Sequence, residues 1–381
     1  MNGMNKALSA QKIGHANSRP TLTEDTRGAV AVLVAIMLVV LLSFGALALD
    51  ISNAMIARNE LQNVADGSAL AGARALGVIY QGLPAGTPYT TYVLSSPGAV
   101  VTAATGVALL NKARQAAAVA ILPADIQIGV WNTTTHILTV GNVGATGVRV
   151  TARLDASAGG NGAVATWLAG VMNISSMNVS ATATAALTGA GVLPPGTANA
   201  PFAFDENFFT NPAFCNMPIM FYPTTTSCAS FQTFDQSPSN ANTMGNIIDG
   251  LAANPPTYQA PQITAGQTSL EFIGGNVASA FPNLLNLYLA RRVPDTSNPP
   301  TSPNGWCWNV TVPVYSNPSN LTCGNPSGSL LITGFANACV FNVQGPPTQQ
   351  INAIVTCGAV TGGPGGGGTF GVVGAIPGLV E

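Results

Sequence analysis

The sequence predicts an α+β fold in which an N-terminal transmembrane helix continues into a long extracytoplasmic helix packed on a small antiparallel sheet. A strand- and loop-rich, disulfide-containing region follows. Three observations predict this architecture: an uncharged apolar run at residues 28–49, alternating apolar and polar residues within 125–188, and six cysteines confined to residues 215–357. Such alternation is typical of strands that bury one face.

The composition favours an exported protein over a cytoplasmic enzyme. Charged residues make up 7% of the 381 residues, against roughly 25% in an ordinary soluble protein. The formal net charge is −2, and Arg291 and Arg292 are the only basic residues after Asp155. Nucleic-acid binding needs clustered Lys and Arg to neutralise phosphates. We therefore expect no nucleic-acid partner.

Residues 28–49 are long enough to cross a membrane as a helix. They contain 22 residues and no charge, and about 20 helical residues span the hydrocarbon core. The boundary residues are Arg27, Gly28, Leu49 and Asp50. Basic residues concentrate before the run, so residues 1–27 are expected to form a cytoplasmic tail and the body to lie outside.

A cleaved signal peptide is the alternative for this run, because Ala46-Leu47-Ala48 resembles a cleavage site. Two features oppose cleavage. The apolar core is longer than the 7–15 residues typical of a signal. The helical apolar pattern also continues beyond Ala48, through Ile51, Met55, Leu61, Val64, Ala65, Ala69 and Leu76.

Residues 50–188 read as an α+β domain. One helix is expected over 28–77, a loop over 78–98 and a second, Ala-rich helix over 99–122. Alternation predicts strands at 125–131, 136–141, 147–154 and 177–187, with a short helix at 164–172. The long helix should pack on this sheet.

The remainder has a different composition. Residues 189–201 are expected to be a linker, 202–360 a cysteine-containing β-rich region, and 361–381 a flexible Gly-rich tail. The best strand candidates are 308–316, 329–345 and 351–360.

The six cysteines predict disulfides formed in an oxidising compartment. They are Cys215, Cys228, Cys307, Cys323, Cys339 and Cys357. Among the 15 possible pairings, the three sequential pairs close the shortest loops and are favoured. A metal site needs tighter Cys or His spacing, and His15 and His136 are the only histidines. We therefore expect no metal and no cofactor.

Residues 27–76 resemble the N-terminal segment of TadG-like proteins of the Tad (Flp) pilus assembly system. That family shows Arg-Gly before the span, Asp directly after it, and an Arg/Leu-Gln/Asp pattern leading into an Ala-rich helix. The matching positions are Arg27, Gly28, Asp50, Arg58, Leu61, Gln62, Asp66, Ala69, Leu70, Ala71 and Ala73.

The resemblance implies a bacterial inner-membrane protein, non-enzymatic, that contributes to pilus biogenesis or adhesion beside other pilus-assembly proteins. Some relatives carry an adhesion domain whose metal site needs Asp-x-Ser-x-Ser. Here Gly159 replaces the second Ser after Asp155, so we expect a turn without metal. Related pilins carry a Glu where this chain has Leu33, which favours an anchored protein over a filament subunit.

The outer half of the long helix has two interpretations. Arg58, Leu61, Gln62 and Asp66 could dock another pilus-system protein, or the helix could pack on the protein's own sheet. Small Ala side chains permit close approach in either case. Asp50 marks the end of the span.

A surface adhesin or glycan-binding module anchored by the same helix is the alternative function. Trp306 and Trp308 flank Cys307, and exposed aromatic rings could stack on sugars. An enzyme is not expected. Glycosidases need two carboxylates set across a sugar, whereas Asp205 and Glu206 are adjacent, and no G-x-S-x-G nucleophile motif occurs. No small-molecule ligand is expected either.

Overall fold

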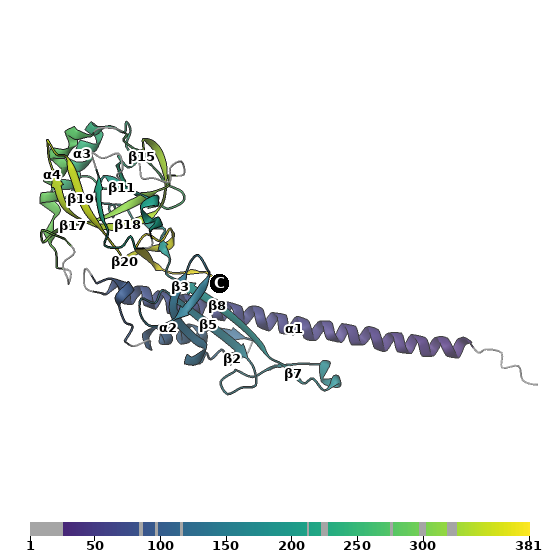
Figure 1. Ribbon diagram of the computed structural model, residues 1–381. Helices are drawn as coiled ribbons and strands as arrows, with labels where there is room; N and C mark the ends of the chain where they lie inside the picture. Colours follow the sequence, from purple (N-terminus) through teal and green to yellow (C-terminus); the bar gives the residue numbers. More distant parts are fainter. Residues whose placement is uncertain are drawn as a thin grey trace, which may run out of the picture. The chain divides into compact units, whose positions relative to one another are not determined.

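Figure 1 shows the computed structural model, which has an α+β fold. The structure describes residues 26–83, 87–95, 98–114, 117–211, 213–221, 228–274, 277–296, 302–317 and 326–381. Most of the expected cytoplasmic tail, and His15 within it, lies outside these residues. The chain divides into two compact units: Met1–Asn53 with Ala165–Ser176, and Ala54–Val164 with Met177–Glu381.

The longest element is helix α1, Thr26–Gln81. It covers the predicted span and the predicted outer helix without a break. No proline occurs within it, and its single glycines are too few to interrupt a helix of this length. From Ala57 onward one face of the helix joins a buried core: Ala57, Leu61, Val64, Ala65, Ala69, Ala73, Leu76 and Tyr80.

The outer half of α1 packs on a five-stranded sheet with the order β22-β8-β5-β3-β4 within the described chain. All four pairings are antiparallel. The strands are β3 (Ile126–Asn132), β4 (Ile137–Val140), β5 (Gly147–Leu154), β8 (Val179–Ala186) and β22 (Gly378–Leu379). Alternate side chains of β5 and β8 enter the core shared with α1, as the period of two requires.

Helix α2 (Gly98–Leu110) adds Val100, Ala104 and Ala108 to this core. The prediction of a helix to residue 122 was wrong. After Leu110 the chain forms β1 (Lys112–Ala113) and β2 (Ala117–Ala118), and the Val119 N–H donates to the Asn111 carbonyl at 3.2 Å. This reversal lets Val119 and Ile121 reach the core, which a straight helix would not allow. Short 3₁₀ helices lie at η1 (Tyr89–Thr91) and η2 (Pro123–Asp125).

The cysteine-containing region is built on a second, eight-stranded sheet with the path β12-β19-β18-β17-β11-β13; β15 pairs with β18 and β16 with β17. The strands are β11 (Phe202–Asp205), β12 (Pro218–Phe221), β13 (Ala229–Phe231), β15 (Ser269–Phe272), β16 (Val293–Pro294), β17 (Trp306–Tyr315), β18 (Gly328–Gln344) and β19 (Gln350–Thr356). The predicted strands near 308, 329 and 351 are therefore present.

Two helices pack on this sheet, α3 (Ala241–Ala252) and α4 (Phe281–Arg291). The Asn240 side chain caps α3 by accepting hydrogen bonds from the N–H groups of Asn242 and Thr243. Phe281, Leu284 and Leu287 of α4 enter a core of aromatic and aliphatic side chains shared with the sheet. The 3₁₀ helices η4 (Glu206–Thr210) and η5 (Ala278–Ala280) complete the region.

The sequential disulfide pairing was wrong. Disulfides join Cys215 to Cys357 and Cys307 to Cys339, and Cys228 is also disulfide-bonded; Cys323 lies outside the described residues. Strand pairing explains the difference. The antiparallel β17–β18 register sets Asn309 against Cys339, and the β12–β19 register sets Pro218 against Ile354. The sheet therefore brings together cysteines that are distant in sequence.

The expected linker and flexible tail also contain strands. Residues 189–201 include β9 (Gly189–Ala190) and β10 (Val192–Leu193), and β10 pairs with β14 (Ile263–Thr264). The Gly-rich tail forms β20 (Ala359–Gly367), β21 (Val372–Ile376) and β22. Glycine permits this packing, because a Cβ at Gly189 would lie 2.1 Å from the Gly368 carbonyl oxygen.

Candidate functional site

The first half of α1 presents an exposed apolar surface. The stretch beginning at Val30 belongs to the one helix, among the described residues, that is long and apolar enough to cross a membrane. Its large side chains are exposed along the whole run, for example Val40 at 45% and Leu41 at 70%. Leu33, at the position where related pilins carry Glu, belongs to this surface. A bilayer provides the environment that these side chains require.

Asp50, directly after this run, is only 2% exposed. Its carboxylate accepts hydrogen bonds from three successive backbone N–H groups, those of Trp167 (2.8 Å), Leu168 (3.1 Å) and Ala169 (2.7 Å). These N–H groups, of which Trp167 and Ala169 contribute most, hold the pKa of Asp50 below its ordinary value. Asp50 thus stays ionised at neutral pH and fastens a distant segment to the helix.

That segment is the 165–176 loop, which lies between β6 (Val164–Ala165) and β7 (Ser176–Met177). The short helix predicted at 164–172 is limited to the 3₁₀ helix η3 (Ala169–Met172). The N–H groups at the start of η3 bind Asp50, and Asn173 ends the turn with a φ of +65°. The loop exposes Trp167 (79%), Leu168 (42%) and Ile174 (50%).

The motif residues of the outer helix make mainly intramolecular contacts. Leu61 is fully buried, and the Gln62 amide donates to Asp66 at 2.8 Å and to the Thr182 carbonyl at 3.3 Å. Arg58 differs: it is exposed and makes no hydrogen bond or ion pair among the residues that the structure describes. Of the four residues expected to dock a partner, Arg58 is the one with an exposed side chain.

Residues 28–75 match the family model described as "Putative Flp pilus-assembly TadE/G-like". The match agrees with the resemblance drawn from Arg27 to Leu76. No curated protein and no solved structure matches the chain.

The TadE/G-like segment covers the exposed span and most of the buried outer half of α1. It therefore joins an exposed apolar surface to the core of a folded domain in one continuous helix. Close packing fixes its far end. Arg74 donates to the Ala375 carbonyl at 2.7 Å, and a Cβ at Gly77 would lie 2.3 Å from the oxygen of that carbonyl. The rest of the chain lies outside the matched segment.

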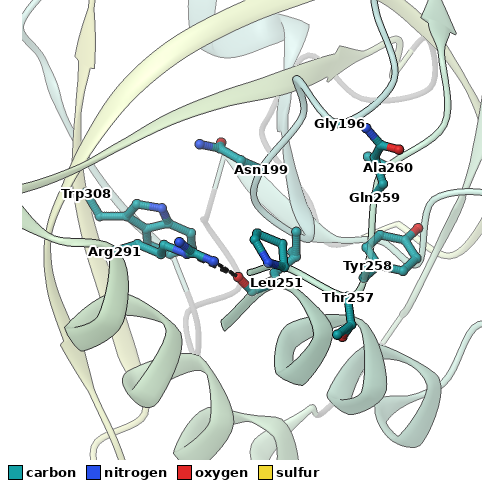
Figure 2. Close-up of a pocket in the computed structure, with 10 residues that line it drawn as sticks. Gly196, Asn199, Leu251, Thr257, Tyr258, Gln259, Ala260, Arg291 and Trp308 are labelled. Carbon is teal, nitrogen blue, oxygen red and sulfur yellow. Dashed lines mark hydrogen bonds between the residues drawn. The ribbon is translucent and has the colours of Figure 1, made fainter. Parts of the chain in front are cut away.

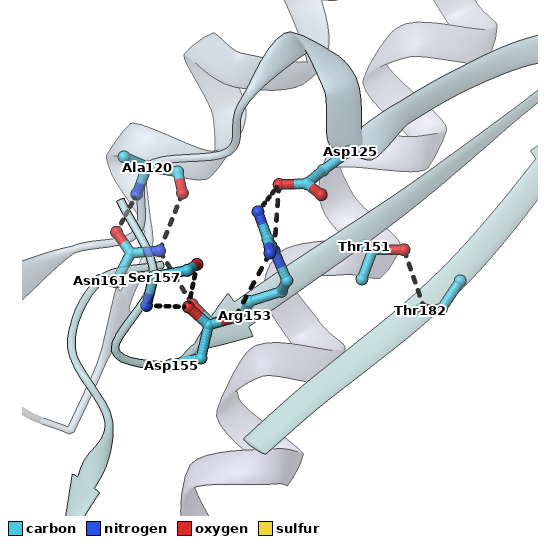
Figure 3. A network of polar contacts seen from close by, with 8 residues as sticks. All are labelled: Ala120, Asp125, Thr151, Arg153, Asp155, Ser157, Asn161 and Thr182. Atoms are coloured by element: carbon cyan, nitrogen blue, oxygen red, sulfur yellow. Dashed lines mark hydrogen bonds and ion pairs between the residues drawn. The ribbon is translucent and has the colours of Figure 1, made fainter. Parts of the chain in front are cut away.

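Asp155 lies in a turn after β5, within a polar network (Figure 3). Its Oδ1 accepts hydrogen bonds from both the N–H and the hydroxyl of Ser157, and these lower its pKa. Its Oδ2 pairs with Arg153 at 3.3 Å, and Arg153 pairs with Asp125 at 2.8 Å. Asn161 joins this turn to the Ala120 backbone. Both carboxylate oxygens of Asp155 therefore stabilise the turn.

A cavity of about 600 Å³ lies beside α3 and α4 (Figure 2). Arg291 lies at its edge, but its guanidinium donates to the carbonyls of Leu251 and Ala253, both at 2.7 Å, and so caps the end of α3. The buried hydroxyl of Tyr258 has no partner among the described residues, and burial raises the pKa of this phenol. The described lining contains no carboxylate. This chemistry offers no acid–base pair.

The two tryptophans beside Cys307 have different surroundings. Trp308 is 2% exposed and packs edge-on against Phe202 at a ring separation of 6.3 Å. Trp306 is 38% exposed, and the Arg292 guanidinium lies 4.7 Å from its ring centre. Trp306 is therefore the one of this pair with a ring at the outer surface, whereas Trp308 lines the cavity of Figure 2. Among the described residues, no group of three His, Cys, Asp or Glu side chains could hold a metal ion.

Proposed function

We propose that this protein is a non-enzymatic, membrane-anchored component of Tad/Flp pilus assembly that contributes to pilus biogenesis or adhesion. The observation that carries the proposal is the TadE/G-like match over residues 28–75, which covers the exposed span and the helix rooted in the folded body. In this proposal the N-terminus is cytoplasmic, α1 crosses the inner membrane once, and the body lies in the periplasm or at the surface. The positive charges before Gly28 support that orientation.

In this proposal a partner protein binds the exposed face of α1 that carries Arg58. Met55 (63% exposed), three residues earlier, lies beside it on the helix surface. The other motif residues hold this part of α1 on its own domain. Leu61 packs in the core, and Gln62, which also binds Asp66, donates a hydrogen bond to the sheet. A cation beside an exposed apolar side chain suits a partner helix that carries a carboxylate next to apolar residues.

Crosslinked pull-down from native membranes tests both parts of the proposal. We expect wild-type protein to recover other pilus-assembly proteins and Arg58→Glu to recover far less. Lys112→Glu is the matched control, because Lys112 is also exposed but lies outside α1. Failure of the wild type to recover any pilus component would overturn the function. Equal recovery by Arg58→Glu would overturn only the docking face.

Two further measurements test the anchor and its orientation. Protease shielding in spheroplasts should protect residues 1–27 and expose the body. Mass spectrometry of the mature protein should find the residues before Leu49 still attached. A mature N-terminus at Leu49 would contradict a retained anchor.

A surface adhesin that binds glycans is the second candidate, because Trp306 presents a partly exposed ring beside Arg292. Aromatic faces stack on sugars, and a nearby guanidinium can donate hydrogen bonds to hydroxyls. This candidate predicts digestion of the body by protease added to intact cells. It also predicts glycan-array binding that Trp306→Ala abolishes.

A further inference from the structure

We propose that the 165–176 loop is a membrane-contact element that inserts Trp167, Leu168 and Ile174 into the headgroup boundary of the bilayer crossed by α1. The inference rests on the anchor in the proposed function and adds a second point of attachment to it. It requires no pilus partner. The loop and residues 1–53 belong to the same compact unit.

The hydrogen bonds to Asp50 set the level of the loop along the membrane normal. Asp50 directly follows Leu49, the last residue of the apolar run, and one helical residue advances only about 1.5 Å. The headgroup layer extends roughly 5–7 Å beyond each side of the hydrocarbon core. Because the N–H groups of Trp167 and Ala169 lie 2.8 and 2.7 Å from the Asp50 carboxylate, their backbone lies within that layer.

The side chains of the loop suit that layer. Residues 165–176 contain no charged residue, so insertion requires no charge to leave water. Trp167 is 79% exposed, and tryptophan concentrates at membrane interfaces because its ring is apolar while its N–H can still donate a hydrogen bond. Ile51, 48% exposed and next to Asp50, extends the same apolar surface on the helix.

The loop is also held in shape before it meets a membrane. Three N–H groups bind Asp50, the Thr166 N–H donates to the Ser175 carbonyl at 3.1 Å, and the Ile174 N–H donates to the Ala169 carbonyl at 3.0 Å. A preformed loop loses little conformational entropy on binding. The backbone donors nearest the membrane are already satisfied, as a low-dielectric environment requires.

Lipid is the occupant that these observations favour over another protein. The apolar surface of the loop lies beside the exposed apolar surface of α1 that begins at Val30 and faces hydrocarbon. The loop offers no charge or unpaired backbone donor at Trp167, Leu168 or Ala169 by which a protein partner would be selected.

Depth-resolved fluorescence of the full-length protein tests the proposal. Wild-type protein and Trp167→Phe are reconstituted into phosphatidylcholine nanodiscs, and the difference between their emission spectra isolates Trp167. We expect the Trp167 emission to be blue-shifted, to lose most of its intensity with lipids brominated near the headgroup, and to resist aqueous iodide. Carbonate extraction of both proteins checks separately that α1 remains inserted.

The possible outcomes are distinct. Quenching by brominated lipid with protection from iodide supports membrane contact. Quenching by iodide alone places the ring in water and overturns the proposal. Protection from both quenchers means that protein, including a second copy of the chain, covers the ring, and it also overturns the proposal. Loss of membrane association in carbonate would instead refute the anchor in the proposed function.

Discussion

Leu61→Ala tests whether the family-motif helix is rooted in its own domain. Leu61 is fully buried between α1 and the sheet. The substitution removes three buried carbon atoms, which at about 0.8 kcal/mol each gives a transfer cost of about 2.4 kcal/mol. The cavity left behind raises the expected loss to about 3–5 kcal/mol in the free energy of unfolding. Urea denaturation of the full-length protein in detergent, followed by tryptophan fluorescence, measures this loss.

Met55→Ala is the matched control, because it shortens a large apolar side chain on the same helix at a position that is 63% exposed. We expect it to change the free energy of unfolding by no more than about 0.5 kcal/mol. If Leu61→Ala costs no more than Met55→Ala, Leu61 does not pack in the core as described. The docking interpretation of Leu61 would then regain support.

Three further predictions follow from single contacts. Tyr80→Phe removes the hydroxyl that donates to the buried Ala145 carbonyl at 2.6 Å, and should cost about 1–3 kcal/mol in urea denaturation because that carbonyl loses its partner. Gly77→Ala should lower the melting temperature, because its Cβ would lie 2.3 Å from the Ala375 oxygen. This clash should outweigh the roughly 1 kcal/mol by which alanine favours a helix over glycine. A rise in the melting temperature would contradict the close contact. Because the pKa of Asp50 is lowered in the folded protein, its stabilisation of the 165–176 loop should be complete at neutral pH and be lost only as the pH falls below the ordinary aspartate range. Hydrogen exchange of the loop amides measures this stabilisation. Loss of amide protection near pH 7 would contradict the prediction.

Periodic patterns in the sequence predicted the parts of the fold that local chemistry determines. The apolar spacing of Leu61, Ala65, Ala69 and Leu76 predicted a helix with one buried face, and these residues are all buried. The alternation at 177–187 predicted the strand that forms β8. In both cases the side chains that repeat with the period of the element enter the core.

Features that depend on long-range pairing could not be predicted in this way. The sequence around Asp50 indicates only the end of the span. The N–H groups that bind Asp50 lie more than a hundred residues later in the chain, so no local pattern predicts the contact. The cysteine partners depended on strand registers that the spacing of cysteines does not encode. The glycines of 362–368 suggested flexibility, whereas their small size permits the close backbone approach that β20 requires.

The position of β22 has a consequence for the order of folding. Gly378 and Leu379 pair with Ala186 and Ala185, so the edge of the five-stranded sheet is completed by residues made almost two hundred positions later. During synthesis, chains generally begin to fold from their N-terminal side. In this protein the edge of β8 at Ala185 and Ala186 stays unpaired until the entire cysteine-containing region has been synthesised. Before β22 pairs with it, this edge is open to incorrect pairing or to chaperone binding. In the finished structure it is covered.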